Sequence, residues 1–165
     1  MTTVTLRGNP FHTNGELPAV GAPAPSFSLV GSDLSEITPE SLAGKKLVLN
    51  IFPSIDTPTC AMSVRTFNER AVGRDDTVVL CVSEDLPFAA GRFCGAEGIE
   101  NVKTGSAFRG DFAEVYGVRL QDGPLAGLTA RAVVVVDESG TVTHTQLVGE
   151  IAEEPDYDAA LAALD

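Results

Sequence analysis

Two short, almost continuously apolar segments constrain the fold of this 165-residue chain more than any other feature. Leu47–Phe52 and Thr77–Val82 have the length and composition of strands that are buried on both faces, as parallel strands usually are. Helical patterns follow each of them, over Cys60–Val72 and over Leu86–Phe93, and Gly95 is expected to end the second helix. Strands that alternate with helices in this way predict a parallel segment in an α/β sheet.

The rest of the chain predicts elements that extend this central unit. We expect an N-terminal hairpin (Val4–Leu6 with Phe11–Thr13), a short helix (Ser35–Leu42), a helix over Ser106–Tyr116, a late hairpin (Ala132–Val136 with Val142–Val148) and a terminal helix (Pro155–Leu164). The late hairpin adds an antiparallel pair to the parallel strands. The order predicts one domain over residues 1–165, with a thioredoxin-like fold: a central mixed sheet flanked by helices, plus an N-terminal β-hairpin.

A cysteine stands where the first buried strand gives way to a helix, at the end of the run Pro53-Ser-Ile-Asp-Thr57-Pro-Thr-Cys60. The free N–H groups and the macrodipole of a helix N-terminus favour a thiolate, which is the nucleophilic form of cysteine. Cys60 has no partner in Cys-x-x-Cys spacing, but Cys94 lies downstream as a candidate partner in a redox cycle. From position alone, a buried structural cysteine stays an alternative for Cys60.

Charge and composition exclude several classes of function. With 11 basic and 23 acidic residues the net charge is −12, which repels nucleic acid and anionic lipid. No apolar run reaches the roughly 18–20 residues of a membrane helix, and the N-terminus lacks signal-peptide features, so we expect a cytoplasmic protein. Three cysteines are too few for a disulfide framework, and His12 and His144 lie too far apart in sequence to indicate a zinc site.

The motif Pro53-x-x-x-Thr57-x-x-Cys60 resembles the peroxidatic motif of the peroxiredoxins. The segment Gly21-x-x-Ala-Pro25-x-Phe27-x-Leu29, the run from Asn50 to Cys60, Arg92-Phe-Cys94 and the N-terminal hairpin are together similar to the thiol peroxidase subgroup, the atypical two-cysteine peroxiredoxins of bacteria. The resemblance implies a peroxidase that reduces hydrogen peroxide and organic hydroperoxides, with thioredoxin as its reductant. It also implies a homodimer without a metal or an organic cofactor.

The resemblance also implies roles for individual residues. Cys60 would attack the peroxide and become a sulfenic acid, and Cys94 would resolve it into an intramolecular disulfide. Arg131 occupies the position where peroxiredoxins carry an arginine that holds the thiolate and orients the peroxide, a task that suits a planar guanidinium. Arg65, on the Cys60 helix, is a weaker competitor. Cys81 lies in an apolar strand and is expected to belong to the core.

Thr57 and Pro53 have structural alternatives beside their implied catalytic roles. The Thr57 hydroxyl can reach the thiolate or the peroxide, but threonine before a helix is also a common N-cap, and both roles can hold. Pro53 can shape the loop and shield the thiolate from water, or simply end the strand.

Other functions for the cysteine pair follow from the same residues. The main alternative is a redox-sensing thiol switch that uses Cys60 and Cys94 without catalytic turnover. A thiol-disulfide oxidoreductase would be expected to carry Cys-x-x-Cys, and a cysteine hydrolase needs a histidine base. For the peroxidase we expect the reduced thiols to lie too far apart to bond, so that the ends of both helices must unwind, which Gly91 and Gly95 would ease.

Overall fold

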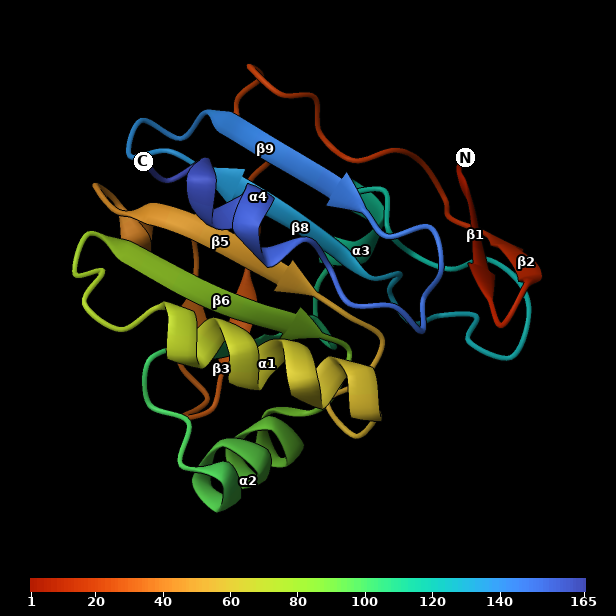
Figure 1. The fold of residues 1–165 in the computed structure, drawn as a ribbon, viewed down its shortest axis with the longest axis horizontal. Coiled ribbons are helices and arrows are strands. Elements are labelled where there is room, and N and C mark those ends of the chain that lie inside the picture. The colour runs from red at the N-terminus through yellow and green to blue at the C-terminus, as the bar shows by residue number, and fades with distance from the viewer.

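The computed structural model describes residues 1–165 and contains a seven-stranded mixed sheet, a separate two-stranded hairpin and helices on both faces of the sheet (Figure 1). The sheet has the order β4-β3-β7-β6-β5-β8-β9. Its strands are β3 (Leu29–Gly31), β4 (Glu36–Ile37), β5 (Lys46–Ile51), β6 (Thr77–Ser83), β7 (Lys103–Ser106), β8 (Ala132–Val136) and β9 (Val142–Leu147). The hairpin is β1 (Thr3–Leu6) with β2 (Asn9–His12), and the helices are α1 (Pro58–Arg70), α2 (Pro87–Glu97), α3 (Phe112–Val115) and α4 (Tyr157–Ala162).

The predicted α/β architecture is confirmed at the centre of the sheet. Strand β5 pairs in parallel with β6 and in antiparallel with β8, which in turn forms the predicted hairpin with β9. Alternate side chains of β5 enter two cores: Leu49 and Ile51 pack on one face, and Val48 packs on the other, together with Phe52, which follows the strand. This alternation is the reason for the nearly continuous apolar run, because both faces of the strand are covered.

The two cores are covered by different helices. On one face, α1, α2 and α4 contribute Phe67, Phe93 and Leu161, and Figure 1 shows α1 and α4 in front of the sheet. On the other face, α3 contributes Phe112, which stacks on Tyr116 with 4.4 Å between ring centroids. No helix of the molecule has the length and apolar character needed to cross a membrane.

The prediction of one helix over Ser35–Leu42 was wrong. Glu36–Ile37 forms the edge strand β4, and only Glu40–Leu42 makes a turn of 3-10 helix. Ile37 is a buried β-branched side chain opposite Leu29, so pairing with β3 outweighs the local helical pattern.

The prediction of a helix over Ser106–Tyr116 was also wrong in its first half. Lys103–Ser106 forms β7, which pairs in parallel with β6, and α3 spans only Phe112–Val115. Gly105 lies within this strand and weakens the sequence pattern that would predict it. A Cβ at Gly105 would lie 2.9 Å from Leu29 Cδ1 and 3.3 Å from Leu80 Cδ1, so the glycine permits close packing of the neighbouring strands.

Helix α2 continues past Gly95, where the sequence analysis placed its end. It ends at Glu97, and Gly98 adopts the left-handed conformation (φ 64°) that commonly closes a helix. Cys94 therefore lies in the last turn of α2 and its carbonyl accepts the N–H of Gly98.

Candidate active site

The loop after β5 places Cys60 in the first turn of α1, as the strand-to-helix pattern predicted. Thr57 has the extended backbone of an N-cap residue, and Pro58 begins the helix, where its fixed φ fits and its missing N–H costs nothing. The Cys60 side chain is fully buried and packs in the core beneath α1. Cys60 therefore lies at a helix N-terminus, and its thiol is screened from bulk water.

Arg131 holds the Cys60 sulfur. The residue is 1% exposed, and its Nη2 donates to Cys60 Sγ at 3.2 Å while its Nε donates to the Ile151 carbonyl at 2.9 Å. The third nitrogen, Nη1, is buried and has no partner within the protein. The free Nη1 group can therefore donate to a second acceptor beside the sulfur.

Arg65, the competing arginine, points away from Cys60. Its guanidinium forms an ion pair with Glu97 at 2.5 Å and lies over the Phe93 ring, 5.7 Å from its centroid. Arg65 therefore ties α1 to α2, and Arg131 is the arginine that contacts the thiol.

Thr57 and Pro53 line a pocket of about 330 Å³ together with Arg131. The Thr57 hydroxyl donates to the Ser54 carbonyl at 3.1 Å and makes no helix-capping hydrogen bond, so the N-cap alternative is not realised by the side chain. With its proton committed, that oxygen remains a hydrogen-bond acceptor at the pocket. Apolar side chains complete the wall: Leu6, Leu125, Leu128 and Ile151.

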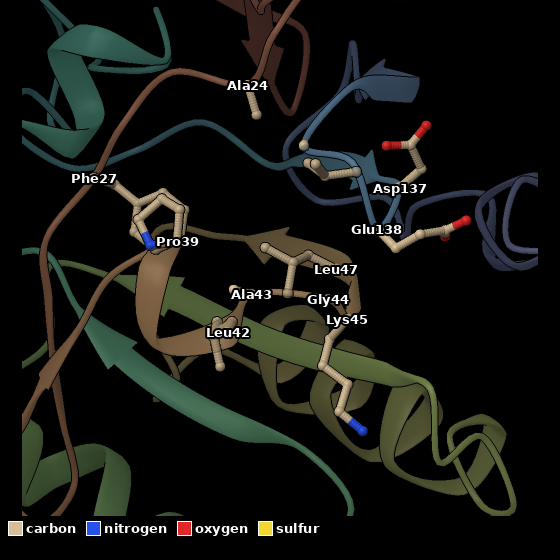
Figure 2. Close-up of a pocket in the computed structure, with 12 residues that line it drawn as sticks. Ala24, Phe27, Pro39, Leu42, Ala43, Gly44, Lys45, Leu47, Asp137 and Glu138 are labelled. Atoms are coloured by element: carbon tan, nitrogen blue, oxygen red, sulfur yellow. The ribbon is translucent and has the colours of Figure 1, made fainter.

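A second, smaller pocket lies at the other end of the sheet. Figure 2 shows Phe27, Leu42 and Leu47 around it, with Lys45 and Asp137 extending away from each other at its rim. Its volume is about 90 Å³ and no cysteine lines it. Since Leu47 lies at the start of β5 and Cys60 follows its end, this pocket is remote from the thiol.

Asp85 is a residue of the site that the sequence analysis missed. Its carboxylate accepts hydrogen bonds from Ser54 Oγ at 2.8 Å, from the Ile55 N–H at 2.7 Å and from Ser83 Oγ at 2.6 Å. It thus ties the loop before Cys60 to the end of β6. A signal was available, because the carboxyl ends of neighbouring parallel strands meet at one edge of a sheet, and a carboxylate follows β6 there.

All three cysteines are free. Cys94 is half-buried, burial raises the pKa of its thiol, and it lines a pocket with Lys103 and Thr104 of β7. Cys60 lies in the first turn of α1, after β5, whereas Cys94 lies in the last turn of α2, beside β7, and β6 separates β5 from β7. This placement favours the expectation that the two residues begin beyond the ~7 Å Cα separation of a disulfide.

The remaining titratable residues of interest lie away from the Cys60 sulfur. Cys81 is in the core, where burial raises its pKa to about 12, and it contacts Asn50 Nδ2 at 3.7 Å. His12 pairs with Asp122 at 2.7 Å on the surface, and His144 lies on β9. No histidine hydrogen-bonds Cys60, so the base that a cysteine hydrolase requires is missing.

Comparisons with known proteins agree with this geometry. Residues 19–161 match the family model described as Redoxin. The chain is 62% identical over 164 residues to a thiol peroxidase of Mycobacterium tuberculosis (99% of each chain) and 58% identical over 165 residues to one of Corynebacterium glutamicum (100% of each). Among solved structures, a peroxiredoxin-like protein from Aquifex aeolicus is 41% identical with a TM-score of 0.93, over 98% of this chain and 95% of that one. A thiol peroxidase from Chromobacterium violaceum shares the fold, with a TM-score of 0.88 at 23% identity over 97% of this chain and 93% of that one.

Proposed function

This chain belongs to the redoxin family and, within it, to the thiol peroxidase subgroup of the peroxiredoxins, and we propose that it reduces hydroperoxides with Cys60 as the nucleophile. The protein is a thiol-dependent peroxidase. The observation that carries the assignment of its site is the buried contact between Arg131 Nη2 and Cys60 Sγ, 3.2 Å apart, beside a pocket that Thr57 and Pro53 line.

In the first step the Cys60 thiolate attacks the terminal oxygen of ROOH. An S–O bond forms, the O–O bond breaks, and ROH leaves after it takes up a proton, so the sulfur is oxidised to a sulfenic acid and the peroxide is reduced. Negative charge moves from sulfur to the leaving oxygen. The fork of Arg131 matches this movement, because Nη2 already holds the sulfur and Nη1 is free for an oxygen of the substrate.

Thr57 and Pro53 prepare the same pocket for the peroxide. The Thr57 hydroxyl donates its hydrogen bond to the Ser54 carbonyl, so its oxygen is left to accept the O–H of the hydroperoxide, which orients the terminal oxygen toward sulfur. Pro53 is buried and offers no N–H group that would bind water at the thiolate.

Cys94 completes the redox cycle as the resolving cysteine. Its thiol attacks the Cys60 sulfenic acid, an S–S bond forms, and water leaves. Because Cys60 is fully buried and Cys94 lies over a different part of the sheet, the first turn of α1 and the last turn of α2 unwind for this step. Two electrons from a thiol reductant then restore both thiols, and thioredoxin is the reductant we propose.

The substrate range includes hydrogen peroxide and organic hydroperoxides, because both polar and apolar side chains line the pocket. We place the protein in the cytoplasm and expect a homodimer, in keeping with the family. Catalysis uses the cysteines and needs neither a metal nor an organic cofactor.

A coupled assay with thioredoxin, thioredoxin reductase and NADPH tests this function. Many equivalents of peroxide consumed per protein, with activity lost in Cys60→Ser and retained in the core variant Cys81→Ala, are the expected result. Consumption of a single equivalent would instead indicate a redox-sensing switch. Peroxide consumption by Cys60→Ser at the parental rate would remove Cys60 from the mechanism.

The role of Cys94 is tested separately, in a single turnover. Cys94→Ser should react once with peroxide and stop at the sulfenic acid, which dimedone traps and mass spectrometry detects. An unimpaired thioredoxin-dependent rate in this variant would assign resolution to another thiol.

A further inference from the structure

We propose that Glu150 is a positioning residue of this peroxidase, which acts through the N-terminal hairpin and the Ile151 carbonyl to fix the guanidinium of Arg131 on Cys60. The inference rests on the proposed function. Arg131 Nε donates a hydrogen bond to the Ile151 carbonyl at 2.9 Å. That bond sets the rotation of the guanidinium plane, and therefore where Nη1 and Nη2 lie.

The segment that carries this carbonyl lies outside the main sheet and takes its backbone partners from the hairpin. The Thr5 N–H donates to the Gly149 carbonyl at 2.7 Å, and the Ile151 N–H donates to the Thr5 carbonyl at 2.7 Å. Figure 1 shows the hairpin standing off the sheet at the end where β5 and β6 finish. The hairpin therefore acts as a short pairing strand for the segment that orients Arg131.

The Glu150 carboxylate joins the hairpin to the segment that carries the Ile151 carbonyl. Glu150 Oε1 accepts hydrogen bonds from Thr5 Oγ1 and from the Gly8 N–H, both at 3.1 Å, and Oε2 accepts from the Ala152 N–H at 2.9 Å. These hydrogen bonds lower the pKa of Glu150 below its usual value, and the one from the Ala152 N–H has the largest effect. A lowered pKa is expected for a carboxylate that accepts several hydrogen bonds.

Glu150 binds the two-residue turn of the hairpin, whose central residues both have positive φ, as in a type I′ turn. Arg7 has a positive φ of 51°, which is unfavourable for a residue with a side chain, and Gly8 follows with φ 83°. Leu6 and Arg7 line the substrate pocket. A single carboxylate thus holds both the rim of the pocket and the backbone behind Arg131.

The same segment reaches the Cys60 helix directly. Thr59 Oγ1 donates to the Ala152 carbonyl at 3.0 Å, one residue before the nucleophile. Loss of the Glu150 carboxylate would therefore loosen the arginine and the first turn of α1 with respect to each other, although Glu150 touches neither Cys60 nor Arg131 in any hydrogen bond.

The test measures the second-order rate of Cys60 oxidation in Glu150→Ala, in Arg131→Ala and in the double variant. Displacement of a reacting group by a fraction of an ångström is costly, so Glu150→Ala should slow the reaction on the order of tenfold or more. In the Arg131→Ala background the same change should have almost no further effect, since the residue acts through the arginine. A full additional loss in the double variant would overturn the proposal.

Two further variants separate positioning from general loss of structure. Glu150→Gln keeps one acceptor oxygen for Thr5 and Gly8 and should recover part of the rate, whereas a rate equal to that of Glu150→Ala would count against the proposal. Glu153→Ala, a matched change on the same loop whose side chain makes no hydrogen bond, should keep the parental rate. If the parent protein itself consumes no peroxide, the proposed function fails; if the parent is active and Glu150→Ala is as fast, only this inference fails.

Discussion

Arg131 Nη2 and Cys60 Sγ lie 3.2 Å apart, and both side chains are shielded from solvent, with 1% and 0% of their surfaces exposed. An arginine cannot give up its proton in a protein, so its burial calls for hydrogen-bond acceptors, and the Ile151 carbonyl and Cys60 Sγ provide two. The contact thus places a fixed cation directly beside the sulfur that we propose as the nucleophile. It also makes Arg131 and Cys60 an interdependent pair.

The first prediction follows from this pair. Arg131→Ala should lose about 2–4 kcal/mol of transition-state stabilisation, by analogy with loss of an oxyanion donor, which corresponds to a rate roughly 30- to 1,000-fold lower. Arg131→Lys keeps the charge but not the fork and should also be slow. Stopped-flow competition with a reference peroxidase measures both rates, and Arg65→Ala serves as the matched control. A nearly parental rate in Arg131→Ala would contradict the assignment.

The second prediction separates the two roles of Thr57. Thr57→Val should slow the peroxide reaction by roughly ten- to hundredfold, because a hydrogen bond to the substrate is lost, whereas Thr57→Ser should remain close to the parent. An N-cap side chain would be worth ~1 kcal/mol of stability, but Thr57 makes no capping bond, so urea unfolding of Thr57→Val should change by less than that. A stability loss without a rate loss would favour the capping role.

The third prediction concerns Asp85, which accepts three hydrogen bonds between the Cys60 loop and the end of β6. Asp85→Ala should slow attack on peroxide, because the loop loses its anchor. The same variant should form the Cys60–Cys94 disulfide faster, because the loop opens more easily. Quenched-flow alkylation with mass spectrometry follows both steps, and Asp75→Ala, an exposed carboxylate near β6, is the control. Slower disulfide formation in Asp85→Ala would refute the idea that loop opening limits resolution.

The fourth prediction is a pH dependence of stability. Burial raises the pKa of Cys81 from 9.0 to about 12, so the folded state keeps a proton that the unfolded chain releases. The stabilisation is complete below about pH 9 and is lost as the pH rises toward 12, with an upper bound of about 4 kcal/mol from three pK units. Urea midpoints measured from pH 8 to 11 should fall, and should fall less steeply in Cys81→Ala. Equal slopes in both proteins would exclude this origin.

The sequence by itself determined the centre of the molecule and its chemistry. The apolar run of Leu47–Phe52, the helix signal at Pro58 and the position of Cys60 are local patterns, since each depends on residues that are neighbours along the chain. The same is true of the late hairpin between Val136 and Val142. Short-range periodicity and turn chemistry specify such features before any tertiary contact forms.

The tertiary structure alone decided the features that depend on distant partners. Lys103–Ser106 became a strand because β6 and β3 accept it as a neighbour, against its weak local pattern. The choice of Arg131 over Arg65 could not be derived from spacing alone, because it depends on where the start of β8 meets the first turn of α1, 71 residues away in the chain. The role of Glu150 depends on the tertiary contact between the hairpin and the segment around residue 150. A hydrogen bond between Thr5 and Glu150 cannot be predicted from local sequence patterns, because the two residues are far apart in the chain.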